Sequence, residues 1–72
     1  MKAYYIRYKM HQFDEEHGVD LLAANKADAY DKAIYEIIPQ KEGSVPYSAW
    51  VCSVTYNNGN CKHFNTHEGK PY

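Results

Sequence analysis

The stretch ANKADAYDKAIYEIIP, residues 24–39, carries the marks of an amphipathic helix with a start and a face. Asn25 suits the N-cap position, because its side-chain oxygen can accept a bond from a backbone N–H of the first turn. Asp28 places an acid near the positive end of the helix dipole. At about 100° per residue the apolar side chains fall on one arc. They are Tyr30, Ala33, Ile34 and Ile37, with Ala27, Ala29 and Ile38 at the edges. We therefore expect a helix over residues 25–38 that packs on another layer.

Two residues of this stretch do not fit a simple amphipathic helix: Pro39 at its end and Tyr35 on its outer face. Pro39 disfavours helical geometry at Ile38, so the helix either ends there or continues as one further turn that begins at Pro39. Tyr35 falls on the polar side of the helix, where the other residues are charged. These are Asp28, Asp31, Lys32 and Glu36.

Two strands are expected before the helix. Residues 2–10, KAYYIRYKM, alternate, and this pattern is typical of a half-buried strand. Tyr4, Ile6, Tyr8 and Met10 form one face, and Tyr5, Arg7 and Lys9 form the other. The polar residues 11–18 predict a turn. Residues 19–24 then predict a second strand that buries Val19, Leu21 and Ala23; the alternative is a helix that begins at Asp20. The Asn25 cap and the first strand's need for a partner favour the strand.

Two more strands are expected after the helix and a loop over residues 40–47. In residues 48–56 the pattern predicts two faces. Trp50, Cys52, Val54 and Tyr56 lie on one, and Ala49, Val51, Ser53 and Thr55 on the other. Residues 57–60, NNGN, are the strongest turn signal of the chain, and residues 61–66 return as a strand.

The register of this last hairpin has two solutions. A two-residue turn at Asn58-Gly59 pairs Tyr56 with Cys61. A three-residue loop with a bulge at Gly59 pairs Tyr56 with Asn60 instead. We favour the longer loop, because it buries Phe64 beside Trp50.

The predicted fold class is therefore α+β, with the order β-β-α-β-β. One helix packs on one face of a four-stranded sheet, mixed or antiparallel, in a two-layer arrangement. Residues 1–72 form a single domain, in which residues 66–72 are expected to be a flexible tail.

Charge and composition exclude several classes of function. The net charge is −1, which gives no overall basic footprint for nucleic acid. Residues 1–13 sum to +3, residues 14–42 to −5 and residues 43–72 to +1, which together return −1. No apolar run has the length of a signal or membrane segment, so we expect a cytoplasmic protein with no membrane partner. Cys52 and Cys61 lack metal-type spacing and fit free thiols in a reducing compartment.

The sheet face away from the helix is the predicted binding surface, because it has no obvious cover and is unusually apolar. Its candidate residues are Tyr5, Arg7, Lys9, Leu22, Val51 and Thr55. The leading hypothesis is a non-enzymatic module that binds another protein or a second copy of itself. The alternative is single-stranded nucleic acid, since Tyr5 could stack on bases while Arg7 and Lys9 contact phosphates.

Two patterns that contain histidine could support chemistry. His11 and His17 flank an acidic turn and are weak candidates for a divalent metal site. Cys61 and His63, two apart on a strand, share a face at about 6.6 Å, which is long for a direct hydrogen bond. No catalytic frame or cofactor motif is evident, so we expect no enzyme activity, no cofactor and no catalytic residue.

One segment resembles a known family. In DLLAANKADAYDKAIYEI, residues 20–37, the match lies in Ala24, Asn25, Ala29 and Ala33. This strand-to-helix step is similar to that of DpnD/PcfM-like proteins of phages and conjugative elements. The last part, YSAWVCSVTYNNGNCKHFNTHEGKPY, resembles small uncharacterised proteins of mobile elements in Gram-positive bacteria. The resemblance implies an accessory cytoplasmic protein and no catalytic residues.

Overall fold

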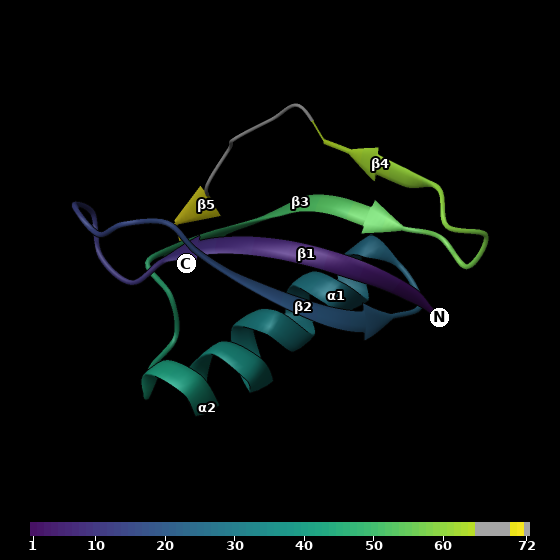
Figure 1. The fold of residues 1–72 in the computed structure, drawn as a ribbon. Helices are drawn as coiled ribbons and strands as arrows, with labels where there is room; N and C mark the ends of the chain where they lie inside the picture. Colours follow the sequence, from purple (N-terminus) through teal and green to yellow (C-terminus); the bar gives the residue numbers. More distant parts are fainter. Residues whose placement is uncertain (65–69, 72) are drawn as a thin grey trace.

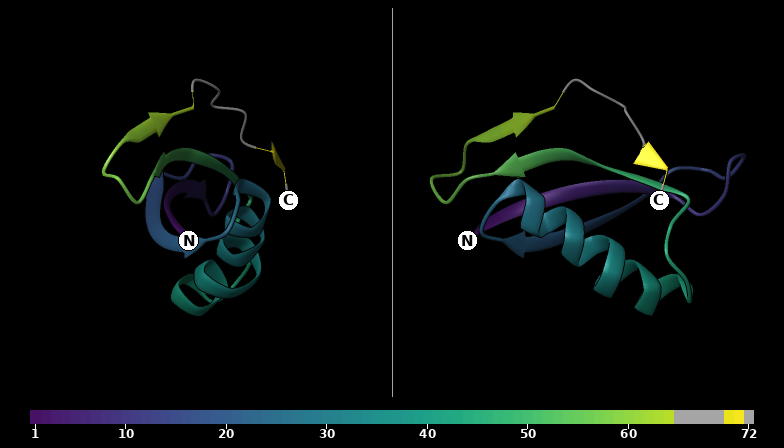
Figure 2. Two further views of the ribbon diagram at one scale, coloured as in Figure 1. Left: turned by 90° about the vertical axis from the view of Figure 1, so that its right-hand side faces the viewer. Right: turned by 180° about the vertical axis from the view of Figure 1, so that it is seen from behind.

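A single helical segment covers one face of an antiparallel sheet in the computed structural model, which describes residues 1–64 and 70–71 (Figures 1 and 2). In chain order the elements are β1 (Lys2–Lys9), β2 (His17–Ala23), α1 (Lys26–Lys32), η1 (Ala33–Ile37), α2 (Ile38–Glu42), β3 (Ser48–Thr55), β4 (Cys61–His63) and β5 (Lys70–Pro71). The sheet order is β2-β1-β3-β4, and β5 pairs with Ser48 and Ala49 at the start of β3. The predicted two-layer α+β fold is confirmed, and the sheet is antiparallel.

The helical segment begins as its sequence predicts. The backbone N–H of Asp28 donates to Asn25 Oδ1 at 2.8 Å. After α1 the helix widens into the π-helical turn η1, where the N–H of Ile38 donates to the carbonyl of Ala33. In the described part of the chain, no helix is long and apolar enough to cross a bilayer.

Pro39 opens a further turn, so the second of the two sequence alternatives is correct. Within a regular α-helix a proline ring clashes with the carbonyl four residues earlier, here that of Tyr35. The wider turn that precedes Pro39 offers room for the ring. The segment ends at Gly43, which adopts φ +89° and donates its N–H to the carbonyl of Pro39 at 2.8 Å. Glycine takes this left-handed conformation without steric cost.

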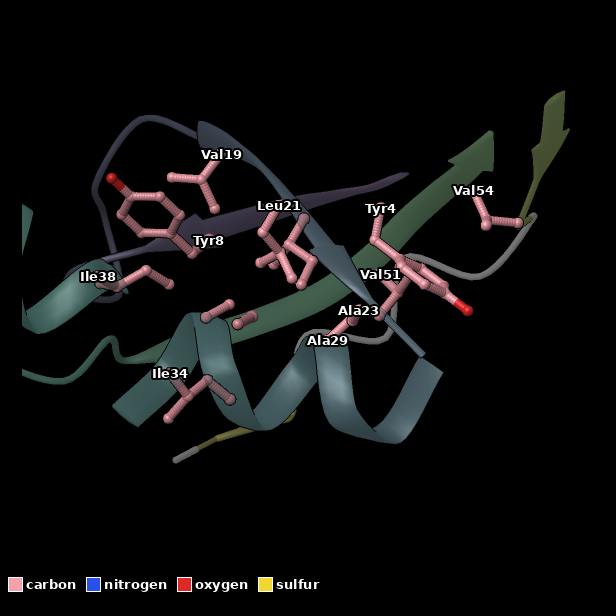
Figure 3. Packing of buried hydrophobic residues seen from close by; sticks show 13 residues of the cluster. Tyr4, Tyr8, Val19, Leu21, Ala23, Ala29, Ile34, Ile38, Val51 and Val54 are labelled. Atoms are coloured by element: carbon pink, nitrogen blue, oxygen red, sulfur yellow. The ribbon is translucent and has the colours of Figure 1, made fainter. Parts of the chain in front are cut away.

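The hydrophobic core lies between the helical segment and the sheet (Figure 3). Both predicted strand alternations are confirmed. The core residues of β1 and β2 are Tyr4, Ile6, Tyr8, Val19, Leu21 and Ala23. The helical segment contributes Ala29, Ala33, Ile34 and Ile38, each with no exposed surface. The small side chains of Ala29 and Ala33 allow the helix backbone to approach the sheet closely.

A β-bulge in β3 overturns part of the predicted pattern. Tyr5 pairs with Ser53, whereas the next residue, Ile6, pairs with Val51, so Cys52 is the extra residue. A bulge shifts the alternation of side chains by one position. Val51 therefore lies in the core beside Tyr4 (Figure 3), and its assignment to the open face was wrong. Trp50 lies on the opposite face, where it pairs with Arg7.

The last hairpin has the favoured three-residue loop. The N–H of Tyr56 donates to the carbonyl of Asn60 at 2.7 Å, and Gly59 adopts φ +91°. Phe64 donates its N–H to the carbonyl of Cys52 and packs against the core, so it does not lie on the face of Trp50 as expected. Of the predicted tail, Lys70–Pro71 form β5, and the rest lies outside the described residues.

Candidate functional site

The face of the sheet that points away from the helix is the candidate binding surface, and we call it the open face. Strand register arranges its side chains in rows that cross the sheet. One row is Leu22, Ala3, Thr55 and Cys61, and the next is Asp20, Tyr5, Ser53 and His63. The structure thus places Tyr5, Arg7, Lys9, Leu22 and Thr55 on this face as predicted, and Val51 on the other.

Exposure is uneven across the open face. Around β3 its middle is already buried, with Trp50 and Ser53 each 8% exposed. At the end where β2 leads to the helix, Leu22 is 61% exposed and Thr55 is also exposed. Leu22, Ala3 and Thr55 lie side by side on three adjacent strands. We call these three residues the open stripe.

Tyr5 and Arg7 belong to a tight cluster on the open face. Arg7 Nε donates to Glu16 Oε1 at 2.9 Å, and Arg7 Nη1 donates to Tyr5 Oη at 3.3 Å. The Tyr5 ring lies over Gly18, so closely that a Cβ at this position would overlap it. The Tyr5 ring therefore occupies space that is free because Gly18 has no side chain.

This cluster bears on the nucleic-acid alternative. The three predicted residues share a face, but Arg7 already forms an ion pair with Glu16. Lys9 Nζ donates to the carbonyl of Gln12 at 3.1 Å, and Asp20 pairs opposite Tyr5 in the strand register. A phosphate would have to compete with one acidic partner and approach a second acid, which lowers the expected affinity.

The β1–β2 turn brings the two candidate metal-ligating histidines to one carboxylate. Asp14 Oδ2 lies 3.0 Å from His17 Nε2, and Asp14 Oδ1 lies 3.9 Å from His11 Nε2. A bond from the N–H of Met10, helped by His17, lowers the pKa of Asp14 below its ordinary value. Within residues 1–64 and 70–71, no three or more His, Cys, Asp or Glu side chains are grouped as a metal site.

A second cluster beside this turn was not foreseen from the sequence. Tyr8 has no exposed surface, donates from Oη to Glu42 Oε2 at 2.7 Å, and stacks at a tilt against His17. Burial, followed by the Glu42 carboxylate, raises the pKa of the Tyr8 phenol. Glu42 is 34 positions from Tyr8 in the chain, and no local pattern marks such a pair.

The side chains of Cys61 and His63 meet at the edge of the open face. Cys61 Sγ lies 3.8 Å from His63 Nε2, so the side chains close the distance that the backbone spacing leaves. Both residues are exposed. Cys52 does not take part: its backbone carbonyl accepts the N–H of Phe64 at 2.9 Å, its side chain is half-buried, and both cysteines are free thiols.

Comparisons of the chain with protein-family models, with curated protein sequences and with solved structures give no significant match. The geometry of the open face and of its side-chain clusters is therefore the basis for a proposed function. The relationship to small proteins of mobile elements stays a prediction.

Proposed function

We propose that the chain is a non-enzymatic protein-binding module that associates with a second copy of itself through the open stripe. The observation that supports this most is the 61% exposure of Leu22 in a strand whose alternate residues are buried. Ala3 and Thr55 beside it are small, so the stripe is flat and suits contact with another flat surface. Burial of such apolar area is the main driving force of association.

The surface area of the molecule limits how tightly two copies can associate. A stable interface buries roughly 800 Å² per partner. The chain exposes 4671 Å² in all, so such an interface would take about a sixth of its surface. The open stripe by itself is smaller than that. We therefore expect weak, concentration-dependent dimerisation, with a dissociation constant in the micromolar range or above.

Sedimentation over a wide concentration range tests the proposal. The average mass should rise with concentration, and Leu22→Lys should return the protein to a monomer, because it places a charge in the apolar contact. Tyr35→Lys is the matched control, since Tyr35 is 64% exposed on the outer face of the helix. It should leave the association unchanged.

Three outcomes would count against the proposal. A strict monomer at the highest concentration removes self-association altogether. An equal effect of Leu22→Lys and Tyr35→Lys shows that the open stripe is not the contact. Loss of the circular-dichroism signal in Leu22→Lys means that Leu22 serves the fold.

Single-stranded nucleic acid is the second candidate, because Tyr5, Arg7 and Lys9 do lie on one face. The role would be that of an accessory protein of a mobile element. Titration with mixed oligonucleotides at low salt tests it, since the phosphate contribution is strongest there. An absence of binding under those conditions excludes it.

A further inference from the structure

Cys61 and His63 are the pair of chemically reactive side chains that the proposed function leaves unused. They occupy alternate positions of β4, and their register partners Thr55 and Ser53 place them on the open face. Sγ and Nε2 approach to 3.8 Å, although residues two apart on a strand are separated by about 6.6 Å along the backbone. The two side chains therefore lean toward each other.

This separation matches that of two ligands on one zinc ion. Zinc binds cysteine sulfur at about 2.3 Å and histidine nitrogen at about 2.0–2.1 Å, with tetrahedral angles. Those values place the two donor atoms about 3.6 Å apart. The observed distance of 3.8 Å between Cys61 Sγ and His63 Nε2 is close to this value, so little movement is needed for both atoms to bind the same ion.

The surroundings leave room for the ion. Both side chains are exposed, so an ion reaches them directly from solvent. The one cation between them in the chain, Lys62, pairs with Val54 and therefore points to the opposite side of the sheet. Its ammonium lies 5.7 Å from the centre of the Phe64 ring. It does not oppose an ion on the Cys61 side.

We propose that Cys61 and His63 form a two-residue chelating site for a thiophilic divalent cation, for which zinc is the best fit. Thiolate and imidazole ligands favour zinc over magnesium or calcium, which bind oxygen. The thiol loses its proton when the metal binds, and the imidazole binds in its neutral form. Water fills the remaining positions. Cys61 pairs with Thr55 of the open stripe, so the metal site borders the proposed contact, but it needs no second copy of the chain.

Cobalt(II) and zinc titrations of the full chain, with a non-thiol reductant present, test this site. Cobalt should produce a thiolate charge-transfer absorption that saturates at one ion per chain, and zinc should abolish it by competition. Zinc binding should release protons and weaken as the pH falls, because protons compete for both ligands.

Three variants make the assignment specific. Cys61→Ser should abolish the charge-transfer absorption, and His63→Gln should weaken binding by more than the 10–100-fold typical of a lost outer-shell partner. Cys52→Ser is the matched control, because it removes the other thiol, and it should bind as the parent does. His17→Gln tests the turn near Asp14 and should also bind normally.

Several results would overturn the proposal. One is a cobalt spectrum without thiolate absorption at saturating metal. Another is binding that survives in Cys61→Ser or is lost in Cys52→Ser or His17→Gln. Circular dichroism of each variant shows whether the fold is intact, and since Cys61 and His63 are exposed, their substitution should leave it unchanged.

Discussion

Tyr8 Oη donates a 2.7 Å hydrogen bond to Glu42 Oε2 and so ties the end of β1 to the last turn of α2. The ring of Tyr8 is fully buried, while its hydroxyl reaches the rim of the core. This bond connects the two layers at the end where the helical segment leaves the sheet.

Tyr8→Phe should lower the free energy of unfolding by about 1.5–3 kcal/mol at neutral pH, the usual net value of a hydrogen bond to a charged group. Because the folded state raises the pKa of Tyr8, its hydroxyl stabilises the fold fully below about pH 10, the ordinary tyrosine value. That contribution is lost as the pH rises further, since the unfolded state then releases the proton first. Urea denaturation from pH 7 to pH 11 measures this.

The Tyr8→Phe variant should lose less stability than the parent protein between pH 7 and pH 11. Burial also raises the pKa of Tyr30, so part of the alkaline loss should remain in both proteins. Glu42→Gln is the control, because its amide oxygen can still accept the bond. Equal stability of Tyr8→Phe and the parent protein across this range would contradict the assignment.

Asp14→Asn should destabilise the β1–β2 turn at neutral pH. The folded state lowers the pKa of Asp14, so its carboxylate stabilises the fold above the ordinary value of 3.8 and loses this effect as the pH falls through the folded value. Thermal unfolding should therefore separate the two proteins at pH 7 and not at about pH 2. A difference that persists at low pH would point to a cause other than ionisation.

Gly18→Ala should cost about 1–3 kcal/mol, because the added methyl group overlaps the Tyr5 ring. In a Tyr5→Ser background the same change should be neutral or slightly stabilising, since alanine fits a strand better than glycine. A double-mutant cycle by urea denaturation gives this coupling directly. Additive effects of the two changes would show that the ring moves aside without cost.

Ala33→Leu should destabilise the protein by about 1–3 kcal/mol, because overpacking pushes the helical segment off the sheet. Ala27→Leu is the matched control on the same helical segment. Ala27 is exposed, so its substitution should change stability by less than about 0.5 kcal/mol. Thermal or urea unfolding compares the two. Equal effects would mean that the alanine face does not set the distance between the layers.

Much of the fold is predictable because local signals agree. The Asn25 cap, the alternation in residues 2–10 and the turn at residues 57–60 each favour the structure that is found. Gly59 even specifies the hairpin register, since the three-residue loop needs a positive φ there. The open face follows from these elements, and five of its six predicted residues lie on it.

The errors have a common physical origin. In residues 48–56 Trp50 and Val51 are adjacent and both apolar, so alternation by itself does not show which one faces the core. The backbone irregularity at Cys52 decides it, and a bulge of this kind needs no special residue. The contacts of Tyr8 with Glu42 and of Tyr5 with Gly18 depend on tertiary packing, which no local pattern records.

The bulge at Cys52 also means that β3 could lose one residue at this position and keep its strand register. A regular strand that loses one residue turns every later side chain to the wrong face. Deletion of Cys52 would instead leave Val51 opposite Ile6 and Ser53 opposite Tyr5, the pairings already present. The sheet can therefore lose one residue of β3 without exchanging the inside and outside faces of this strand.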